Sequence, residues 1–208
     1  MIRGMADGGR VLGRPDYVAA AARAAEALLA GMSTDDGGLL RSSRDGRAAI
    51  PGFLEDYAFL ARGLVALHRA TGDERWMLEA IELVEAARVR FWGDDGAWFD
   101  TMADQDDLLV RSRNLGDGAV PSGIGTMLLV LLDLAELSGE ESYLVDFESA
   151  MTRLSGSFAG NPVGSSYATL SVSRALRMFP DMLPSELDLP SSPVEVTVSP
   201  QKLSLALD

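Results

Sequence analysis

Apolar residues recur at the spacing of an α-helix along most of this chain. The clearest run spans residues 53–70, where apolar side chains fall at every third or fourth position. They are Phe53, Tyr57, Leu60, Leu64 and Leu67, with Leu54, Ala58, Ala61 and Val65 forming a second row one residue later. Because two rows widen the apolar stripe, this pattern predicts a helix that is buried on most sides.

The same spacing predicts further helices, some buried and some amphipathic. They cover residues 15–32, 74–92, 121–138, 140–155 and 165–178, and residues 2–12 resemble the tail of another helix. Between them, residues 93–112 have the pattern of a short β-hairpin, and residues 194–199 alternate as one strand does.

A glycine followed four positions later by an aromatic residue occurs at three helix boundaries. The pairs are Gly13 with Tyr17, Gly72 with Trp76, and Gly139 with Tyr143. Each glycine follows an apolar run and precedes a further helix, which is typical of a left-handed residue ending one helix before the next begins. The sequence therefore predicts tandem helical hairpins.

Two long polar segments repeat the same order of short motifs. Residues 35–54 and 94–125 both contain Asp-Asp-Gly, Leu-Leu, Arg-Ser, Asp-Gly and a Pro-Gly or Pro-Ser-Gly step. This shared order favours duplication over ordinary turn chemistry, although these residue types are turn formers everywhere. Long loops in a compact domain are often functional, and here each precedes a buried helix.

Alternating buried and amphipathic helices predict an inner and an outer layer. We expect an all-α fold over residues 1–179, a partial α/α toroid of about three hairpins plus part of another. Its long loops would lie on one side and its inner helices would line a pocket. A plain helical solenoid is the alternative, and residues 180–208 form a Pro/Ser-rich tail with one strand.

Charge and composition exclude several classes of partner. The net charge is −13 and Lys202 is the only lysine, so nucleic acid and anionic membrane surfaces are not expected partners. Cysteine is absent, no uncharged apolar run reaches the length of a membrane span, and the first residues lack the pattern of a signal peptide. We therefore expect a cytoplasmic protein.

Several motifs resemble those of a known family. RDGRAAIPGFLEDYAFL at residues 44–60, TGDERW at 71–76, AWFD at 97–100 and DGAVPSG at 117–123 resemble the C-terminal half of the YyaL-like, spermatogenesis-associated family of thioredoxin-domain-containing proteins. That resemblance implies a thioredoxin-like domain elsewhere and a six-hairpin toroid similar to N-acylglucosamine 2-epimerases and cellobiose epimerases. Ile124 and Gly125 depart from the family, which usually has Asn-Ser there.

The toroid resemblance implies a sugar or polyol ligand, but imidazole chemistry does not fit. His68 is the only histidine, and proton abstraction by a two-histidine epimerase needs two such groups. Carboxylates are the better candidates: Glu55 and Asp56 open one inner helix and Asp117 precedes another. If the chain is an enzyme, we expect a glycan-active hydrolase or isomerase that uses these acids.

Other residues are candidates for ligand contact. They are Tyr57, Trp98, Phe99, Asp100, Arg111 and Ser122, which lie at helix starts or in the second long loop. No pattern predicts a metal site or a cofactor; Asp104, Asp106 and Asp107 resemble a calcium loop only loosely because the glycine and final glutamate are missing.

Two hypotheses for function remain open from the sequence. One is a carbohydrate-binding or carbohydrate-processing toroid region. The other is a non-enzymatic scaffold or interaction module for a thioredoxin-like partner. The apolar helices 53–70 and 121–138 further predict self-association, because half a toroid leaves them uncovered; the tail after Pro180 is the alternative cover.

Overall fold

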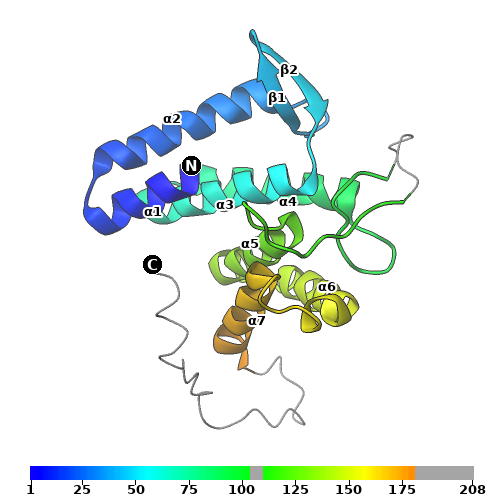
Figure 1. Ribbon diagram of the computed structural model, residues 1–208. Helices are drawn as coiled ribbons and strands as arrows, with labels where there is room; N and C mark the ends of the chain where they lie inside the picture. The colour runs from blue at the N-terminus through cyan, green and yellow to red at the C-terminus, as the bar shows by residue number, and fades with distance from the viewer. Residues whose placement is uncertain (104–109, 181–208) are drawn as a thin grey trace, which may run out of the picture.

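The structure, a computed structural model, describes residues 1–103 and 110–180 (Figure 1). Seven helices and one two-stranded sheet make up this part of the chain. In order they are α1 (Ile2–Leu12), α2 (Pro15–Met32), β1 (Leu40–Arg44), β2 (Arg47–Pro51), α3 (Leu54–Thr71), α4 (Glu74–Phe91), α5 (Gly123–Ser138), α6 (Ser142–Ala159) and α7 (Ser166–Met178). The prediction of a mostly helical chain is therefore confirmed.

Three left-handed glycines end α1, α3 and α5, as the sequence predicts. Gly13, Gly72 and Gly139 have φ angles of 64°, 70° and 74°. Residues with a β-carbon rarely adopt this conformation, so glycine allows the chain to turn sharply into the next helix. Asp73 then caps α4 by accepting a hydrogen bond from the Arg75 amide at 3.0 Å.

The helices pack as two rows. One row consists of α1, α3, α5 and α7, each in contact with the next, and α2, α4 and α6 each pack against the helix that precedes them. Helices α3 and α5 are buried over most of their length because both have neighbours on several sides. The described residues form an open arrangement, so closure into a toroid stays a prediction.

This packing changes the argument for self-association. Leu64, Leu67, Leu128 and Leu131 are fully buried inside the chain. The apolar faces of the helices at 53–70 and 121–138 are therefore covered by their own neighbours. Open apolar surface lies instead along α2, where Leu28 is 40% exposed.

A β-hairpin follows α2 in a segment that the sequence analysis treats as a loop. Strands β1 and β2 are antiparallel, with Leu40 opposite Pro51 and Arg44 opposite Arg47. Between them Asp45 and Gly46 have φ angles of 53° and 74°. Two left-handed residues make the tight turn whose twist matches a β-hairpin, and Asp-Gly is a preferred sequence for it.

The hairpin predicted for residues 93–112 is not present as named strands in the described residues. One isolated antiparallel bridge joins Trp92 and Trp98, and residues 104–109 lie outside the described part. The strand predicted at 194–199 and the whole tail after Pro180 also lie outside it.

The first motif of the two long loops has the same backbone geometry. Thr34 donates to Gly38 at 2.9 Å and Gly37 donates to Thr34 at 3.0 Å, while Gly93 donates to Ala97 and Gly96 to Gly93, both at 2.9 Å. These matching turns support the interpretation of the loops as a duplication. Beyond them the loops diverge, since the first continues into β1 and β2.

Within residues 1–103 and 110–180, none of the helices combines the length and the apolar character that a membrane crossing requires.

Candidate functional site

A small polar cavity lies where the second long loop meets the first turns of α3 and α5. We call it the polar cavity; its volume is about 420 Å³. Its lining includes two carboxylates, three hydroxyl groups and one side-chain amide. These are Glu55, Asp100, Thr101, Ser112, Ser122 and Asn114.

Close contact between two helix starts shapes this cavity. A β-carbon on Gly123 at the start of α5 would lie 2.9 Å from the backbone nitrogen of Glu55 on α3. Glycine therefore lets the two helices approach until their backbones nearly touch. The approach places Glu55 and Ser122 on the same cavity.

Asp100 is the most strongly held carboxylate of the polar cavity. Its Oδ2 accepts hydrogen bonds from Ser112 Oγ at 3.0 Å and from the backbone N–H of Asn114 at 2.7 Å. Its own carbonyl accepts the Leu54 amide at 3.0 Å, which fixes the loop against the start of α3. Burial raises the pKa of Asp100 above its ordinary value, and the negative charge of Glu55 raises it further.

Glu55 and Asp56 share one cation but face different spaces. Arg41 reaches Glu55 at 2.7 Å and Asp56 at 3.4 Å. Asp56 also accepts the Phe53 amide at 2.8 Å, so it caps α3, and burial raises its pKa. Glu55 lines the polar cavity, whereas Asp56 lines a second, larger cavity described below.

Asp117, predicted as a catalytic acid, bonds to two backbone amides in the structure. Its Oδ1 accepts the Ser122 amide at 2.9 Å, and its Oδ2 accepts the Tyr167 amide at 2.8 Å. The carboxylate thus satisfies amide groups at the starts of α5 and α7, which otherwise have no partner inside their helices. Both oxygens are occupied, and Asp117 lines neither cavity.

Two predicted ligand contacts belong to the core. Tyr57 is 1% exposed, packs edge-on against Phe91, and accepts the Leu39 amide at 2.7 Å through its hydroxyl. Trp98 is fully buried and packs edge-on against Trp92. Neither residue lines the polar cavity, and sugar stacking on them stays a prediction.

Phe99 and Arg111 also have structural roles. The guanidinium groups of Arg111 and Arg113 lie 4.0 Å and 3.7 Å from the centre of the Phe99 ring. Arg111 donates to the Thr101 and Arg90 carbonyls, which ties the two limbs of the loop together. The Phe99 ring and the Arg111 guanidinium, which a ligand would contact, are thus already bonded within the protein.

Ser122 lines the polar cavity, but its hydroxyl caps α5. Its Oγ accepts the Gly125 amide at 3.1 Å. The sequence analysis missed Thr101, Ser112 and Asn114. Ser112 belongs to the repeated Arg-Ser step, which is the one signal that pointed to it. Thr101 Oγ1 is buried and has no hydrogen-bond partner among the described residues.

His68 lies at the end of α3, remote from these carboxylates in sequence. Its Nδ1 is 3.1 Å from the Asp73 carbonyl across the Gly72 turn. His68 thus lies at the boundary between α3 and α4. Among residues 1–103 and 110–180, three or more candidate metal ligands do not gather at one point. Asp104, Asp106 and Asp107 lie outside the described residues.

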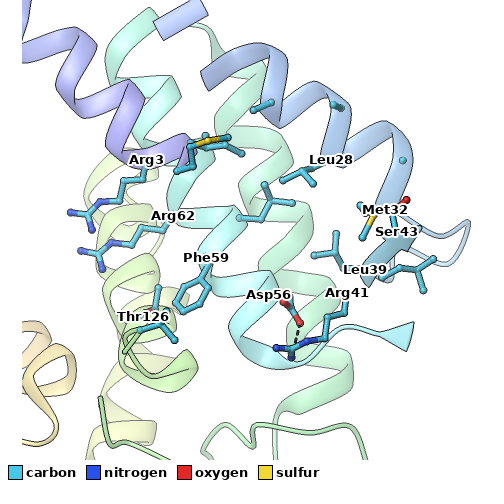
Figure 2. A pocket seen from close by; sticks show the side chains of 18 of the residues that line it. Arg3, Leu28, Met32, Leu39, Arg41, Ser43, Asp56, Phe59, Arg62 and Thr126 are labelled. Atoms are coloured by element: carbon cyan, nitrogen blue, oxygen red, sulfur yellow. Dashed lines mark hydrogen bonds and ion pairs between the residues drawn. The ribbon is translucent and has the colours of Figure 1, made fainter. Parts of the chain in front are cut away.

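The larger cavity is mainly apolar, and we call it the apolar cavity. Its volume is about 840 Å³ and it opens between α1, α2, α3 and β1 (Figure 2). Leu28 and Met32 of α2 lie across from Phe59 of α3 in this view, and Arg3 and Arg62 extend side by side at one end. Val120 and Pro121 line both cavities and separate them.

Relatives of this chain are known, although no protein-family model matches it. Spermatogenesis-associated protein 20 of Rattus norvegicus is 32% identical over 155 residues, which is 69% of this chain and 20% of that protein. The Homo sapiens protein of the same name is 30% identical over the same shares. An uncharacterized Caenorhabditis elegans protein is 31% identical over 136 residues, 61% of this chain and 18% of that protein.

These matches support a relationship to the spermatogenesis-associated protein 20 family. The chain spans about a fifth of the length of the curated relatives that it matches. The names of these relatives state no ligand and no reaction. What the cavities do must therefore be argued from their own chemistry.

Proposed function

We propose that the chain is a carbohydrate-binding region whose polar cavity takes a sugar or a polyol. The observation that carries this proposal is the gathering of Glu55, Asp100 and hydroxyl and amide side chains around one cavity of about 420 Å³. Sugars offer several hydroxyl groups that both donate and accept, and carboxylates and amides are suitable partners for them. Thr101 Oγ1, which has no partner among the described residues, would gain one from such a ligand.

Glu55 and Asp100 are the residues that would carry any reaction. A carboxyl group with a raised pKa keeps its proton closer to neutral pH, which suits Asp100 to the role of general acid. Glu55, held by Arg41, is then the partner that acts as base or nucleophile. Two carboxylates in one cavity are the minimal set for glycoside hydrolysis, so a hydrolase or isomerase that uses carboxylates is the reaction class that we propose.

A binding experiment tests the ligand class. Isothermal titration of the chain against a panel of monosaccharides, disaccharides and polyols should give at least one ligand. Asp100→Asn should weaken its binding about ten- to a hundredfold, because one charge-assisted hydrogen bond contributes roughly 1.5–3 kcal/mol. Asp94→Asn, at an exposed position of the same loop, is the matched control and should bind as the unaltered chain does. A folded chain that binds none of the panel would refute the proposal.

Open apolar surface favours a second candidate function, that of a scaffold. The apolar cavity and the exposed side of α2 offer surface that a thioredoxin-like polypeptide or a second copy of this chain would cover. Sedimentation of the chain, alone and mixed with the thioredoxin-like domain of a relative, tests this function. A monomer that does not change on mixing would contradict it.

Two further parts of the proposal concern the whole molecule. The row of α1, α3, α5 and α7 supports an arc of an α/α toroid, since consecutive inner helices are neighbours in such folds. The absence of cysteine supports a cytoplasmic location, because disulfides are rare in cytoplasmic proteins and this chain can form none.

A further inference from the structure

Two residues that line the apolar cavity each have a buried polar atom with no hydrogen-bond partner among the described residues. The atoms are Arg62 Nη1 on α3 and Thr126 Oγ1 on α5. The side chains that surround the cavity are otherwise mostly aliphatic or aromatic. Buried polar groups in folded proteins are almost always hydrogen-bonded, so two exceptions on one cavity indicate that something supplies the missing bonds.

Arg62 is the more unusual of the two. The residue is 8% exposed, and a guanidinium group at this depth normally pairs with a carboxylate. The acid whose charge raises the pKa of Arg62 is Asp133. Its carboxylate already forms ion pairs with Arg69 at 2.8 Å and with Arg174 at 2.5 Å. The ring of Tyr167 lies 5.1 Å from the Arg62 guanidinium and offers no hydrogen-bond acceptor of a charged kind.

A second arginine, Arg3, lies at this end of the cavity and pairs with Asp7 at 3.4 Å. Arg3 extends beside Arg62 in Figure 2, and the Arg3 and Arg174 charges together with burial lower the pKa of Arg62. In a chain with a net charge of −13, such a cluster is a local exception. An anion placed here would gain from both arginines and relieve their mutual repulsion.

The rest of the cavity selects a particular kind of anion. Away from the two arginines, the cavity is bounded by Phe59 on one side and by Leu28 and Met32 on the other (Figure 2). A volume of about 840 Å³ is typical of cavities that enclose a small organic molecule. A ligand with a carboxylate at one end and an apolar body would match both the arginines and these apolar side chains.

We propose that the apolar cavity binds a small amphipathic carboxylate, whose head group accepts hydrogen bonds from Arg62 and Thr126 and whose body lies along Phe59, Leu28 and Met32. This site is distinct from the polar cavity and does not depend on the binding of a sugar there.

Three probes distinguish the contribution of the charged head group of the ligand from that of its apolar body. Octanoate carries both, octanol carries the body without charge, and acetate carries the charge without the body. Isothermal titration of the whole chain, below the concentration at which octanoate forms micelles, should show octanoate binding at least tenfold more tightly than either of the others. Equal affinity for octanoate and octanol would overturn the proposal, because it would show that the arginines play no part.

Two variants test the assigned residues. Arg62→Gln should weaken octanoate binding about tenfold or more and leave octanol unchanged, and Thr126→Val, which keeps the shape, should weaken octanoate to a smaller degree. Arg47→Gln on β2, at an exposed position, is the control for the loss of one positive charge. Equal octanoate affinity in Arg62→Gln and Arg47→Gln would refute the site.

Stability and self-association provide independent readouts. Removing an unpaired buried charge should not lower the melting temperature, so Arg62→Gln is expected to fold at least as well as the unaltered chain. If sedimentation shows a dimer that octanoate does not dissociate, and octanoate does not bind, a second copy occupies the cavity and the proposal is wrong.

Discussion

The polar and apolar cavities are neighbours that share Val120 and Pro121, yet the polar groups that define each differ in how they are bonded. In the polar cavity, Asp100 and Ser112 bond to each other and Asn114 donates to Asp100. In the apolar cavity, Arg62 Nη1 and Thr126 Oγ1 have no partner among the described residues. The carboxylate at the centre of the polar cavity is bonded within the protein and only the Thr101 hydroxyl lacks a partner among the described residues, whereas the buried guanidinium of the apolar cavity has none there.

This difference follows from which elements supply the walls. The polar cavity is built from a loop and two helix starts, where backbone amides and carbonyls are available to bond side chains. The apolar cavity is built largely from helix faces, where backbone groups are already used within the helices. A polar side chain on such a face has only other side chains or a ligand to bond.

The largest loss of stability should come from Asp117, whose carboxylate holds the segment next to the Val120–Pro121 wall that both cavities share. Asp117→Ala removes the carboxylate that joins the Ser122 and Tyr167 amides, and it should lower the free energy of unfolding by about 2–4 kcal/mol. Thermal unfolding measures this as a fall in melting temperature of roughly 5–15 °C for a chain of this size. Asp94→Ala is the control, and a fall of equal size there would show that Asp117 has no special role.

A smaller effect should distinguish the polar cavity from its neighbour. Gly123→Ala places a methyl group 2.9 Å from the Glu55 nitrogen, so α3 and α5 must separate. We expect a loss of about 1–3 kcal/mol and weaker sugar binding, with octanoate binding little changed. Gly156→Ala in α6 meets no atom within 4 Å and should be neutral or stabilising. Equal loss of octanoate and sugar binding would mean that the two cavities are not independent.

Smaller still should be the effect of removing hydroxyl groups. Thr101→Val and Thr126→Val delete hydroxyls without partners, so the unfolding free energy should stay within about 0.5 kcal/mol or rise. Ser122→Ala deletes a hydroxyl that caps α5 and should cost about 1 kcal/mol. Chemical denaturation measures all three. A cost at Thr126 equal to that at Ser122 would show that Thr126 already has a partner, such as ordered water.

The sequence predicts the helices well because their signals are local. The capping positions of Gly13, Gly72 and Gly139 and the inward face of α4 depend on neighbouring residues only. Trp76, Ala80, Val84, Ala87 and Phe91, which recur at helical spacing within the helix predicted at 74–92, are all buried. The hairpin at Asp45-Gly46 was missed for the opposite reason, since its strands are short and mostly exposed and lack an alternating apolar pattern.

The candidate site was predictable only in part. Glu55 and Asp100 were found because acids near helix starts gather where those starts meet. The burial of Trp98 could not be predicted, because a loop position does not reveal that a ring turns inward against Trp92. The apolar cavity left no signal, since its walls come from α1, α2, α3, β1 and α5, and only tertiary packing brings them together.

The finest test concerns the coupling between Glu55 and Asp100. Burial is the main reason that the pKa of Asp100 is raised, and the charge of Glu55 adds to it. Glu55→Gln removes that charge, so the pKa of Asp100 should fall. Carboxyl carbon chemical shifts, followed by NMR through the titration, measure this directly.

Stability against pH is a second readout of the same pair. An acid whose pKa is higher in the folded chain than in the unfolded chain destabilises the fold as pH rises from 3.8 to the folded pKa. The free energy of unfolding should therefore fall less over this pH range in Glu55→Gln than in the unaltered chain. Glu26→Gln, which removes an exposed acid paired with Arg75, is the control. If the pKa of Asp100 does not change in Glu55→Gln, the two carboxylates do not act as a pair, and the contrast with the apolar cavity then rests on hydrogen bonding alone.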